Sequence, residues 1–148
     1  MQKEKTVRAI IINNSHLLTL RPETKDIFFT PGGRVGPDET LQEALLRELS
    51  EELPGVACEI GGYLGTVEHR WLEPAREQVT GLHHFYRVYT PALVAPVAPP
   101  AAESGLSFVW LHVDELSAYP VQPPSLVMLV PRLLAGGKTL WSACDTGG

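Results

Sequence analysis

Three glutamates, Glu48, Glu51 and Glu52, follow closely after the double glycine Gly32-Gly33. On a helix, residues three and four positions apart are neighbours, so the three carboxylates would gather on one arc. Like charges at that spacing repel, and the repulsion grows when the groups are partly desolvated. A hard divalent cation such as Mg2+ takes oxygen ligands of this kind and commonly bridges one or two carboxylates to substrate phosphates. The other interpretation of these three acids alone is a solvated face.

The residues around these acids predict the helix that positions them. Thr40 followed three residues later by Glu43 is a capping box, which predicts that a helix begins at Thr40. Pro54 has no amide to continue the helical ladder and Gly55 suits a left-handed exit, so we expect the helix to end near Leu53. The acids should flank the buried stripe, which a period of about 100° per residue assigns to five leucines: Leu41, Leu45, Leu46, Leu49 and Leu53.

The spacing of the charged residues resembles the signature of a known family. The signature is the Nudix box, G-x5-E-x7-R-E-U-x-E-E-x-G-U, where U is an aliphatic residue. In this chain Gly33 is followed after five residues by Glu39, and after seven more by the run Arg47-Glu48-Leu49-Ser50-Glu51-Glu52, which matches the box. Every charged position of the box is filled through Glu52. The sequence departs from the pattern once, because a proline stands before the glycine in Leu53-Pro54-Gly55-Val56. We expect this insertion to alter the helix exit and to leave the carboxylates in place.

The resemblance implies an activity and assigns roles to residues. Nudix enzymes use bound metal ions to direct attack of water on a phosphorus of a nucleoside diphosphate linked to another moiety. The resemblance implies that three glutamates, Glu48, Glu51 and Glu52, are both metal ligands and catalytic residues. One of them would act as the general base. Arg47 would orient them, and the carbonyl of Gly32 would join the metal, which is Mg2+ or alternatively Mn2+.

Residues outside the three acids are candidates for substrate and further metal contacts. Glu103 lies in a loop where some Nudix enzymes place an additional metal-binding acid or the general base, although a loop glutamate is more often simply solvated. Arg34 and Arg21 stand where either could bind a phosphate or be a solvated arginine at a strand end. Glu39 matches the first acid of the box and is a candidate for substrate contact, for an outer-shell metal or for support of its loop.

Aromatic and basic residues concentrate between His69 and Tyr86, an interval that includes Arg76. A base can stack on an aromatic ring, a contact worth ~1–3 kcal/mol in nucleic-acid complexes, and Trp71 is our candidate for that ring. Packing of Trp71 under its own loop is the alternative. Trp110 falls in a predicted strand, and we expect it in the core.

Whole-chain properties restrict the class of protein. The 148 residues, 44% of them hydrophobic, are enough for one domain with a single core, and we assign residues 1–148 to it. A net charge of −5 argues against a nucleic-acid binder with a basic surface. No apolar run approaches the ~18 residues of a membrane span. Cys58 and Cys144 are few and far apart, which predicts reduced thiols in a cytoplasmic protein.

Strand-like segments on both sides of the acidic helix, with a late helix over 125–135, favour an α/β fold. The resemblance implies a Nudix-type α/β/α sandwich with a central mixed sheet and a catalytic loop-helix-loop. Pro131 should kink or break the late helix. Residues 91–104 read as an extended loop, and the tail, 138–148, is a candidate for disorder. The strand-like segments are Thr6–Asn13, Leu17–Leu20, Ile27–Thr30, Ala57–Glu68, Val79–Tyr89 and Ser107–Val113.

Three functions remain open on the sequence. The first is Mg2+-dependent hydrolysis of a nucleoside triphosphate, oxidised forms included, to a monophosphate and pyrophosphate; ADP-ribose or a nucleotide sugar is the alternative substrate. The second is a Nudix nucleotide-binding module without hydrolysis, although such modules usually lack a box acid and this chain retains all of them. The third is a related isomerase acting on a prenyl diphosphate. The expected partner is a small nucleotide, not nucleic acid or membrane, and the oligomeric state, a homodimer included, stays open.

Overall fold

The computed structural model describes residues 2–72, 77–137 and 139–146. Strands occupy most of the segments that the sequence predicts as β, and helices follow at both predicted positions. The elements, in chain order, are β1 (Gln2–Ile10), β2 (Ile12–Asn13), β3 (His16–Pro22), β4 (Phe28–Phe29), β5 (Gly32–Arg34), α1 (Leu41–Glu52), β6 (Glu59–Leu72), β7 (Gln78–Tyr89), β8 (Leu106–His112), the 3-10 helix η1 (Val113–Ala118), β9 (Val121–Gln122), α2 (Leu126–Leu134) and β10 (Trp141–Thr146).

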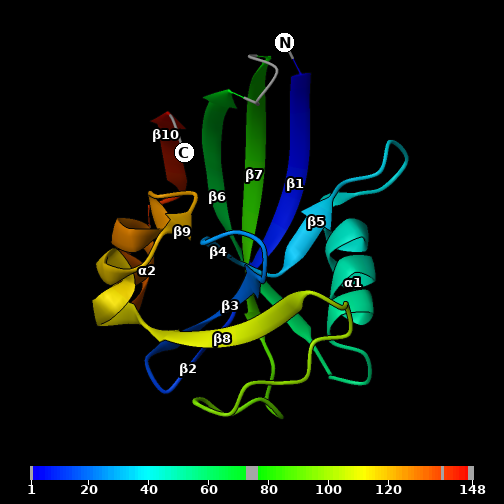
Figure 1. Ribbon diagram of the computed structural model, residues 1–148, viewed down its shortest axis with the longest axis vertical. Helices are drawn as coiled ribbons and strands as arrows, with labels where there is room; N and C mark the ends of the chain where they lie inside the picture. The colour runs from blue at the N-terminus through cyan, green and yellow to red at the C-terminus, as the bar shows by residue number, and fades with distance from the viewer. Residues whose placement is uncertain (1, 73–76, 138, 147–148) are drawn as a thin grey trace.

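The strands form two mixed sheets (Figure 1). The first has the order β10-β6-β7-β1-β5, with β1 parallel to β7 and β10 parallel to β6. The second has the order β2-β3-β4-β9, and β8 pairs with β3. The chain passes from one sheet to the other at Ile11, between β1 and β2. The predicted α/β class with mixed pairing is confirmed, and the strands are divided between two sheets where we expected one.

Each helix covers its own hydrophobic cluster, on opposite sides of the molecule (Figure 1). Neighbouring residues of β1 enter different clusters, because side chains alternate along a strand: Ala9 packs in the first and Ile10 in the second. The first cluster takes Ala44, Leu45 and Leu49 of α1, and the second takes Leu126, Leu129 and Val130 of α2. This helix-sheet-helix layering is the arrangement that the resemblance implied.

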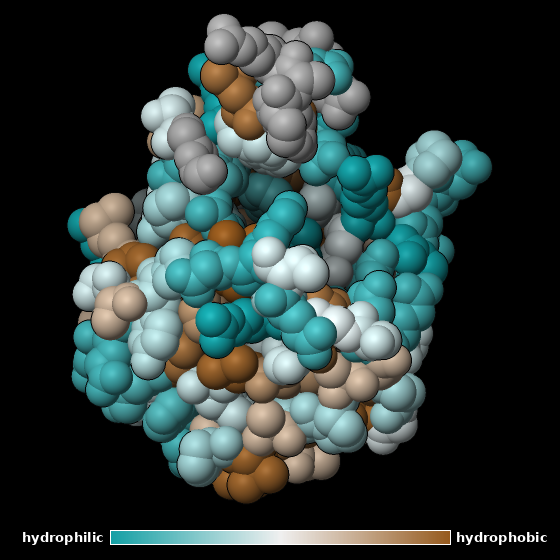
Figure 2. Space-filling model, in the orientation of Figure 1, coloured by the Kyte–Doolittle hydropathy of each residue, from teal (hydrophilic) through white to brown (hydrophobic). Residues whose placement is uncertain are grey.

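The predicted acidic helix is α1. Its capping box is confirmed, because the Glu43 amide donates to Thr40 Oγ1 (3.1 Å) and the Thr40 amide donates to Glu43 Oε1 (2.9 Å). Leu45 and Leu49 are buried as predicted, whereas Leu46 is 50% exposed. The prediction that Leu46 joins the stripe is wrong, since it lies about 100° round the helix from Leu45 and faces solvent. The surface over α1 is accordingly hydrophilic (Figure 2).

The helix exit accommodates the inserted proline outside the helical ladder. The Leu53 amide still donates to the Leu49 carbonyl (2.8 Å), and the Val56 amide donates to the Leu53 carbonyl (3.1 Å). Gly55 adopts a φ of +79°, the left-handed conformation that the sequence predicted. Pro54 therefore changes the turn that leaves α1 and not the positions of the glutamates on it.

The tail is ordered where it is described, so the expectation of disorder is wrong for residues 141–146. They form β10, which adds a parallel strand beside β6. Trp141 is buried and its ring lies 5.4 Å from that of Phe85. The Asp145 carboxylate accepts hydrogen bonds from the Ser125 amide (3.0 Å) and hydroxyl (2.6 Å) just before α2. Residues 138, 147 and 148 of the tail lie outside the described part of the chain.

Other sequence predictions can be compared directly. Trp110 is buried in the first cluster, as predicted, and its Nε1 donates to the Val97 carbonyl (2.9 Å). Pro131 lies inside α2 and does not divide it. Cys58 and Cys144 are both free thiols. Within the described ranges, no helix has the length and apolar character needed to cross a membrane.

Candidate active site

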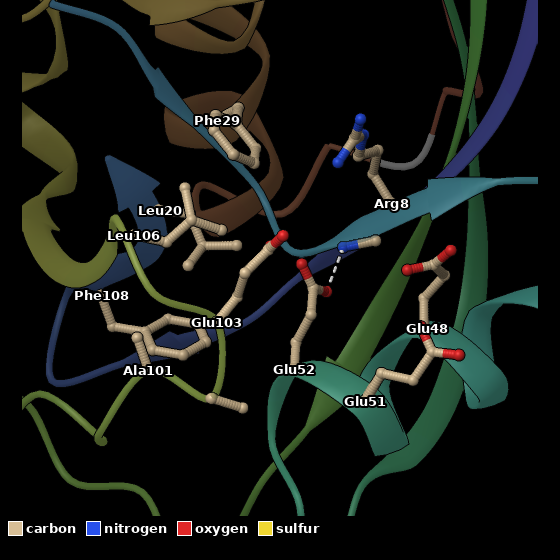
Figure 3. Close-up of a pocket in the computed structure, with 12 residues that line it drawn as sticks. Arg8, Leu20, Phe29, Glu48, Glu51, Glu52, Ala101, Glu103, Leu106 and Phe108 are labelled. Atoms are coloured by element: carbon tan, nitrogen blue, oxygen red, sulfur yellow. Dashed lines mark hydrogen bonds between the residues drawn. The ribbon is translucent and has the colours of Figure 1, made fainter. Parts of the chain in front are cut away.

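The acids of α1 line a cavity of about 480 Å³ (Figure 3). Glu48, Glu51 and Glu52 enter it from the helix, and Gly32 enters it from β5. Glu103 comes from the loop before β8, across the cavity, and its carboxylate points toward Glu52. The structure thus brings the five residues predicted as metal ligands to one cavity.

The two glycines allow the β5 turn to approach the helix closely. Gly32 has a φ of +141°, and a Cβ on it would collide with the Val7 carbonyl of β1. Its amide donates to Glu52 Oε1 (2.8 Å). A Cβ on Gly33 would collide with the Glu48 carboxylate. The space that glycine leaves at position 33 is therefore occupied by one of the candidate ligands.

The Glu52 carboxyl has an unusually high affinity for a proton. Burial raises its pKa to about 7, and the nearby carboxylates of Glu48 and Glu103 act in the same direction. The Gly32 amide and the Arg8 guanidinium oppose this rise. The cavity therefore carries more negative charge than its own donors neutralise, and either a proton or a cation would relieve it.

Arg47 joins the loop to the helix. Its Nε donates to Glu39 Oε2 (2.7 Å) and its Nη2 to Glu39 Oε1 (2.8 Å), while its Nη1 donates to Glu48 Oε1 (2.9 Å). The paired hydrogen bonds from Arg47 lower the pKa of Glu39 to about 2, and the Glu39 and Glu48 carboxylates raise the pKa of Arg47. Glu39 Oε1 also accepts from the Gly36 amide (2.7 Å). Glu39 therefore supports the loop, one of its three predicted roles, and Arg47 orients Glu48.

The donor atoms of the cavity suit a hard divalent cation. Carboxylates and a backbone carbonyl are available, and the described lining contains neither histidine nor cysteine. Within the described ranges, no three acidic, histidine or cysteine side chains already converge on one point. The Glu51 side chain is 61% exposed, and its Oε1 lies 3.8 Å from Arg47 Nη1.

A second cavity, of about 630 Å³, adjoins the first and shares Arg8 and Phe29 with it. Trp71 lines it, beside the His69 ring 5.1 Å away. His83 also lines it, and its Nδ1 hydrogen-bonds to Thr6 Oγ1 (2.6 Å). Burial lowers the pKa of His83 to about 3, so this imidazole is neutral at physiological pH. The predicted aromatic candidate thus lines a cavity next to the acids.

The two predicted arginines do not line either cavity. Arg21 lies 3.5 Å from Asp26, and its guanidinium stacks over the Phe28 ring. The exposed Arg34 pairs with Glu4 (2.6 Å). Its backbone carbonyl accepts a hydrogen bond from Arg47 Nη2 (3.0 Å), so Arg34 helps to hold the loop before α1 against the helix. Arg76, in the predicted aromatic and basic interval, lies outside the described residues.

Sequence reasoning missed Arg8, which lines both cavities from β1. Its Nη1 donates to the Thr30 carbonyl (3.1 Å), and its guanidinium lies 5.6 Å from the centre of the Phe29 ring. Burial lowers the pKa of Arg8, and the Glu52, Glu48 and Glu4 carboxylates oppose that change. The available signal was a single arginine within the apolar strand segment TVRAIII.

The comparison with protein families gives one direct result. A model of the NUDIX domain family matches residues 2–130, most of the chain and all of the segment that builds the acidic cavity. The chain therefore belongs to the NUDIX domain family.

Individual relatives agree with this assignment. The CTP pyrophosphohydrolase of Escherichia coli (strain K12) is 29% identical over 133 residues, which cover 87% of this chain and 90% of the relative. The crystal structure of a MutT NUDIX hydrolase from Burkholderia pseudomallei matches with a TM-score of 0.68 and 22% identity, covering 88% of this chain and 98% of that one. An ADP-ribose pyrophosphatase from Streptococcus suis matches with a TM-score of 0.59 and 16% identity, over 96% and 98% of the two chains.

The two structural likenesses support the fold alone, because both identities are low. Family membership and the curated relative together confirm the predicted enzyme class, a Nudix-type hydrolase of phosphorus-containing acid anhydrides.

Proposed function

We propose that the protein hydrolyses a diphosphate linkage in a nucleoside triphosphate, giving a nucleoside monophosphate and pyrophosphate with Mg2+ as the cofactor. The observation that carries this proposal is that two cavities with different linings adjoin each other. One is lined by four carboxylates and Gly32, and the other by Trp71, His69 and His83. Phosphates with a bound cation suit the first cavity, and a nucleoside suits the second.

Within this proposal Glu48, Glu51, Glu52 and Glu103, with the Gly32 carbonyl, are the residues that would hold Mg2+, and Mn2+ offers the same oxygen preference. When bound, the cation would polarise phosphoryl oxygens and lower the pKa of a water ligand. Arg47 keeps the Glu48 carboxylate in place. A carboxylate of the cavity accepts a proton from the attacking water, whose oxygen bonds to one phosphorus of the α–β bridge while the bond from that phosphorus to the bridging oxygen breaks, so that the monophosphate and pyrophosphate separate.

The nucleoside end of the substrate would lie in the second cavity. Trp71 offers a ring on which a base can stack. The neutral His83, hydrogen-bonded through Nδ1 to Thr6, offers its other ring nitrogen as a hydrogen-bonding group. A cytosine nucleotide is the first substrate to test, because the curated relative is a CTP pyrophosphohydrolase.

A substrate panel tests the proposal. The protein is incubated with CTP, dCTP, the other nucleoside triphosphates, ADP-ribose and UDP-glucose, each with Mg2+, with Mn2+ and with chelator. The products are identified by anion-exchange chromatography. We expect equal amounts of monophosphate and pyrophosphate from a triphosphate, and no products with chelator.

Other results would identify the alternatives. AMP and ribose 5-phosphate from ADP-ribose, without triphosphate turnover, would favour the nucleotide-sugar class. A rise in melting temperature with a nucleotide but no product from any compound would favour a binding module. Isomerisation of a prenyl diphosphate without release of phosphate would favour the isomerase.

We also propose that residues 1–148 act as one catalytic domain in the cytoplasm. Strand β1 contributes Ala9 to one hydrophobic cluster and Ile10 to the other, so the two clusters share a strand. The free thiols of Cys58 and Cys144 suit a reducing compartment.

A further inference from the structure

Arg8 lies at the junction of the two cavities. Of the described residues, only Arg8 and Phe29 line both. Arg8 is also the one cation among the described residues that line the carboxylate cavity. Its guanidinium extends away from Glu48 and lies across the β5 turn from the acids of α1 (Figure 3). A ligand that occupies both cavities must therefore pass this side chain.

The charge of Arg8 has little compensation in the described structure. A guanidinium carries five N–H donors, and the hydrogen bond of Arg8 that the described residues show is the one from Nη1 to the Thr30 carbonyl. No carboxylate of the described residues lies within 4.0 Å of it as an ion pair. Glu52, Glu48 and Glu4 act on it only through space. The Arg8 side chain is half-buried, and a partly desolvated cation without a close partner is unfavourable, which suggests that a ligand supplies the partner.

We propose that Arg8 binds the phosphate that connects the nucleoside to the rest of the phosphate chain. The inference rests on the proposed function, in which the nucleoside occupies the second cavity and the phosphates reach the carboxylates. Phe29, the other residue at the junction, is apolar and offers no partner for an anion. A planar guanidinium can bind two phosphate oxygens at once, which an ammonium cannot do. Arg8 thereby positions the phosphate chain against the acids.

A purely structural role for Arg8 makes a different prediction. Arg8 would then be a counter-charge for Glu52 and Glu48, whose carboxylates favour its charged form. Removing it would raise the pKa of Glu52 further and change the free energy of unfolding. It would not change how much a 5′-phosphate adds to the affinity for a nucleoside. That increment is the quantity to measure.

The experiment compares cytidine with CMP, and adenosine with AMP, by calorimetric titration of chelator-treated protein. We expect wild type to bind the monophosphate roughly 10- to 100-fold more tightly than the nucleoside, the usual effect of hydrogen bonds to a charged group. Arg8→Gln should abolish this ratio without changing the affinity for the nucleoside. Arg8→Lys should retain part of it, since a lysine keeps the charge and loses the fork. Arg132→Gln removes an exposed arginine of α2 and should keep the whole ratio.

A ratio that survives in Arg8→Gln overturns the inference, as does a wild type that binds no monophosphate more tightly than its nucleoside. If Arg8→Gln does not fold, Arg8→Lys decides: a several-fold smaller ratio supports the inference, and an unchanged ratio overturns it. The measurement needs no turnover. A substrate panel without products would therefore refute the proposed hydrolysis, while the binding ratio still decides the role of Arg8.

Discussion

Glu52 takes up a proton more readily than an exposed glutamate, because burial disfavours its charged form and the acids beside it add to that effect. A raised pKa in the folded state means that the folded protein binds more protons than the unfolded chain between pH 4.5 and about 7. The stability that this carboxyl contributes is fully present below pH 4.5 and is lost as the pH rises through about 7. Glu52 by itself therefore makes metal-free protein less stable as the pH rises toward 7, whereas His83, whose pKa is lowered to about 3, acts in the opposite direction.

Denaturant unfolding of chelator-treated protein between pH 4 and pH 8 measures this loss. We expect Glu52 to account for a decrease on the order of 1–2 kcal/mol, allowing for solvent screening of a carboxyl that is only partly buried. The variant Glu52→Gln should lack that part of the pH dependence. Added divalent cation should restore stability most at the high-pH end, where the carboxylate needs no deprotonation. Identical pH profiles for wild type and variant would show that the Glu52 proton is not coupled to folding.

A second prediction for a single residue concerns Gly33, because a Cβ there would occupy the position of the Glu48 carboxylate. Gly33→Ala should displace Glu48 and weaken divalent-cation binding by at least ~10-fold, the usual cost of disturbing a ligand's supports. Calorimetric titration with Mn2+ would measure this. Gly62→Ala is the matched control, since a Cβ there has open space and Gly62 is not among the residues with positive φ. Equal cation affinities in the two variants would contradict the assignment of Glu48 as a ligand.

The sequence predicted the positions of some site residues and not of others. Glu48, Glu51 and Glu52 fill a family signature whose spacing is local, so the helix brings them to one cavity as predicted. Arg8 belongs to no such signature, and its position depends on the distant Thr30 and Phe29. The Arg21 prediction rested on its place near the end of a strand, and a local pairing with Asp26 takes that side chain elsewhere.

At the scale of the element, α1 depends on its first turn. Thr40 Oγ1 accepts from the Glu43 amide, a donor that has no partner within the helix. Thr40→Ala should lower the free energy of unfolding by about 1 kcal/mol. Chemical denaturation would measure the difference. The control, Ser50→Ala, removes a hydroxyl of the same helix that donates to the Arg47 carbonyl and caps no terminal amide.

We expect the control to change stability by less than about 0.5 kcal/mol. Equal losses in the two variants would mean that the capping box does not stabilise α1. A weaker cation affinity in Thr40→Ala would additionally show that the first turn helps to hold the acids.

Elements with local signals were predictable, and elements made by distant pairing were not. Both ends of α1 follow from the capping box and from the Pro-Gly exit. By contrast, β10 exists because Trp141 packs against Phe85 and the strand pairs with β6, more than sixty positions earlier. Nothing near residues 141–146 signals that partner, and the glycines at the end of the chain favoured disorder instead.

At the scale of the whole molecule, the candidate site is assembled from several elements. The helix α1 and the turn at β5 supply Gly32 and three acids, and the loop before β8 supplies Glu103. The second cavity draws on β1, β6 and β7 of the first sheet and on β4 and β9 of the second. The division of the strands into two sheets could not be read from local patterns, since it depends on the chain leaving one sheet at Ile11. The carboxylate end of the site was therefore predictable, whereas at the nucleoside end the sequence indicated Trp71 and not the strands of the second sheet that complete the cavity.

Hydrolysis of CTP by wild type, Glu51→Gln and Glu52→Gln, with Mg2+ and with chelator, tests the central claim most directly. We predict equal amounts of CMP and pyrophosphate from wild type with Mg2+, none with chelator, and at least a ~100-fold lower rate for each variant, as expected when a cation loses a carboxylate ligand. Circular dichroism would confirm that the variants are folded. Turnover that persists at the wild-type rate in both folded variants, or with chelator, would contradict a metal-dependent reaction at these acids.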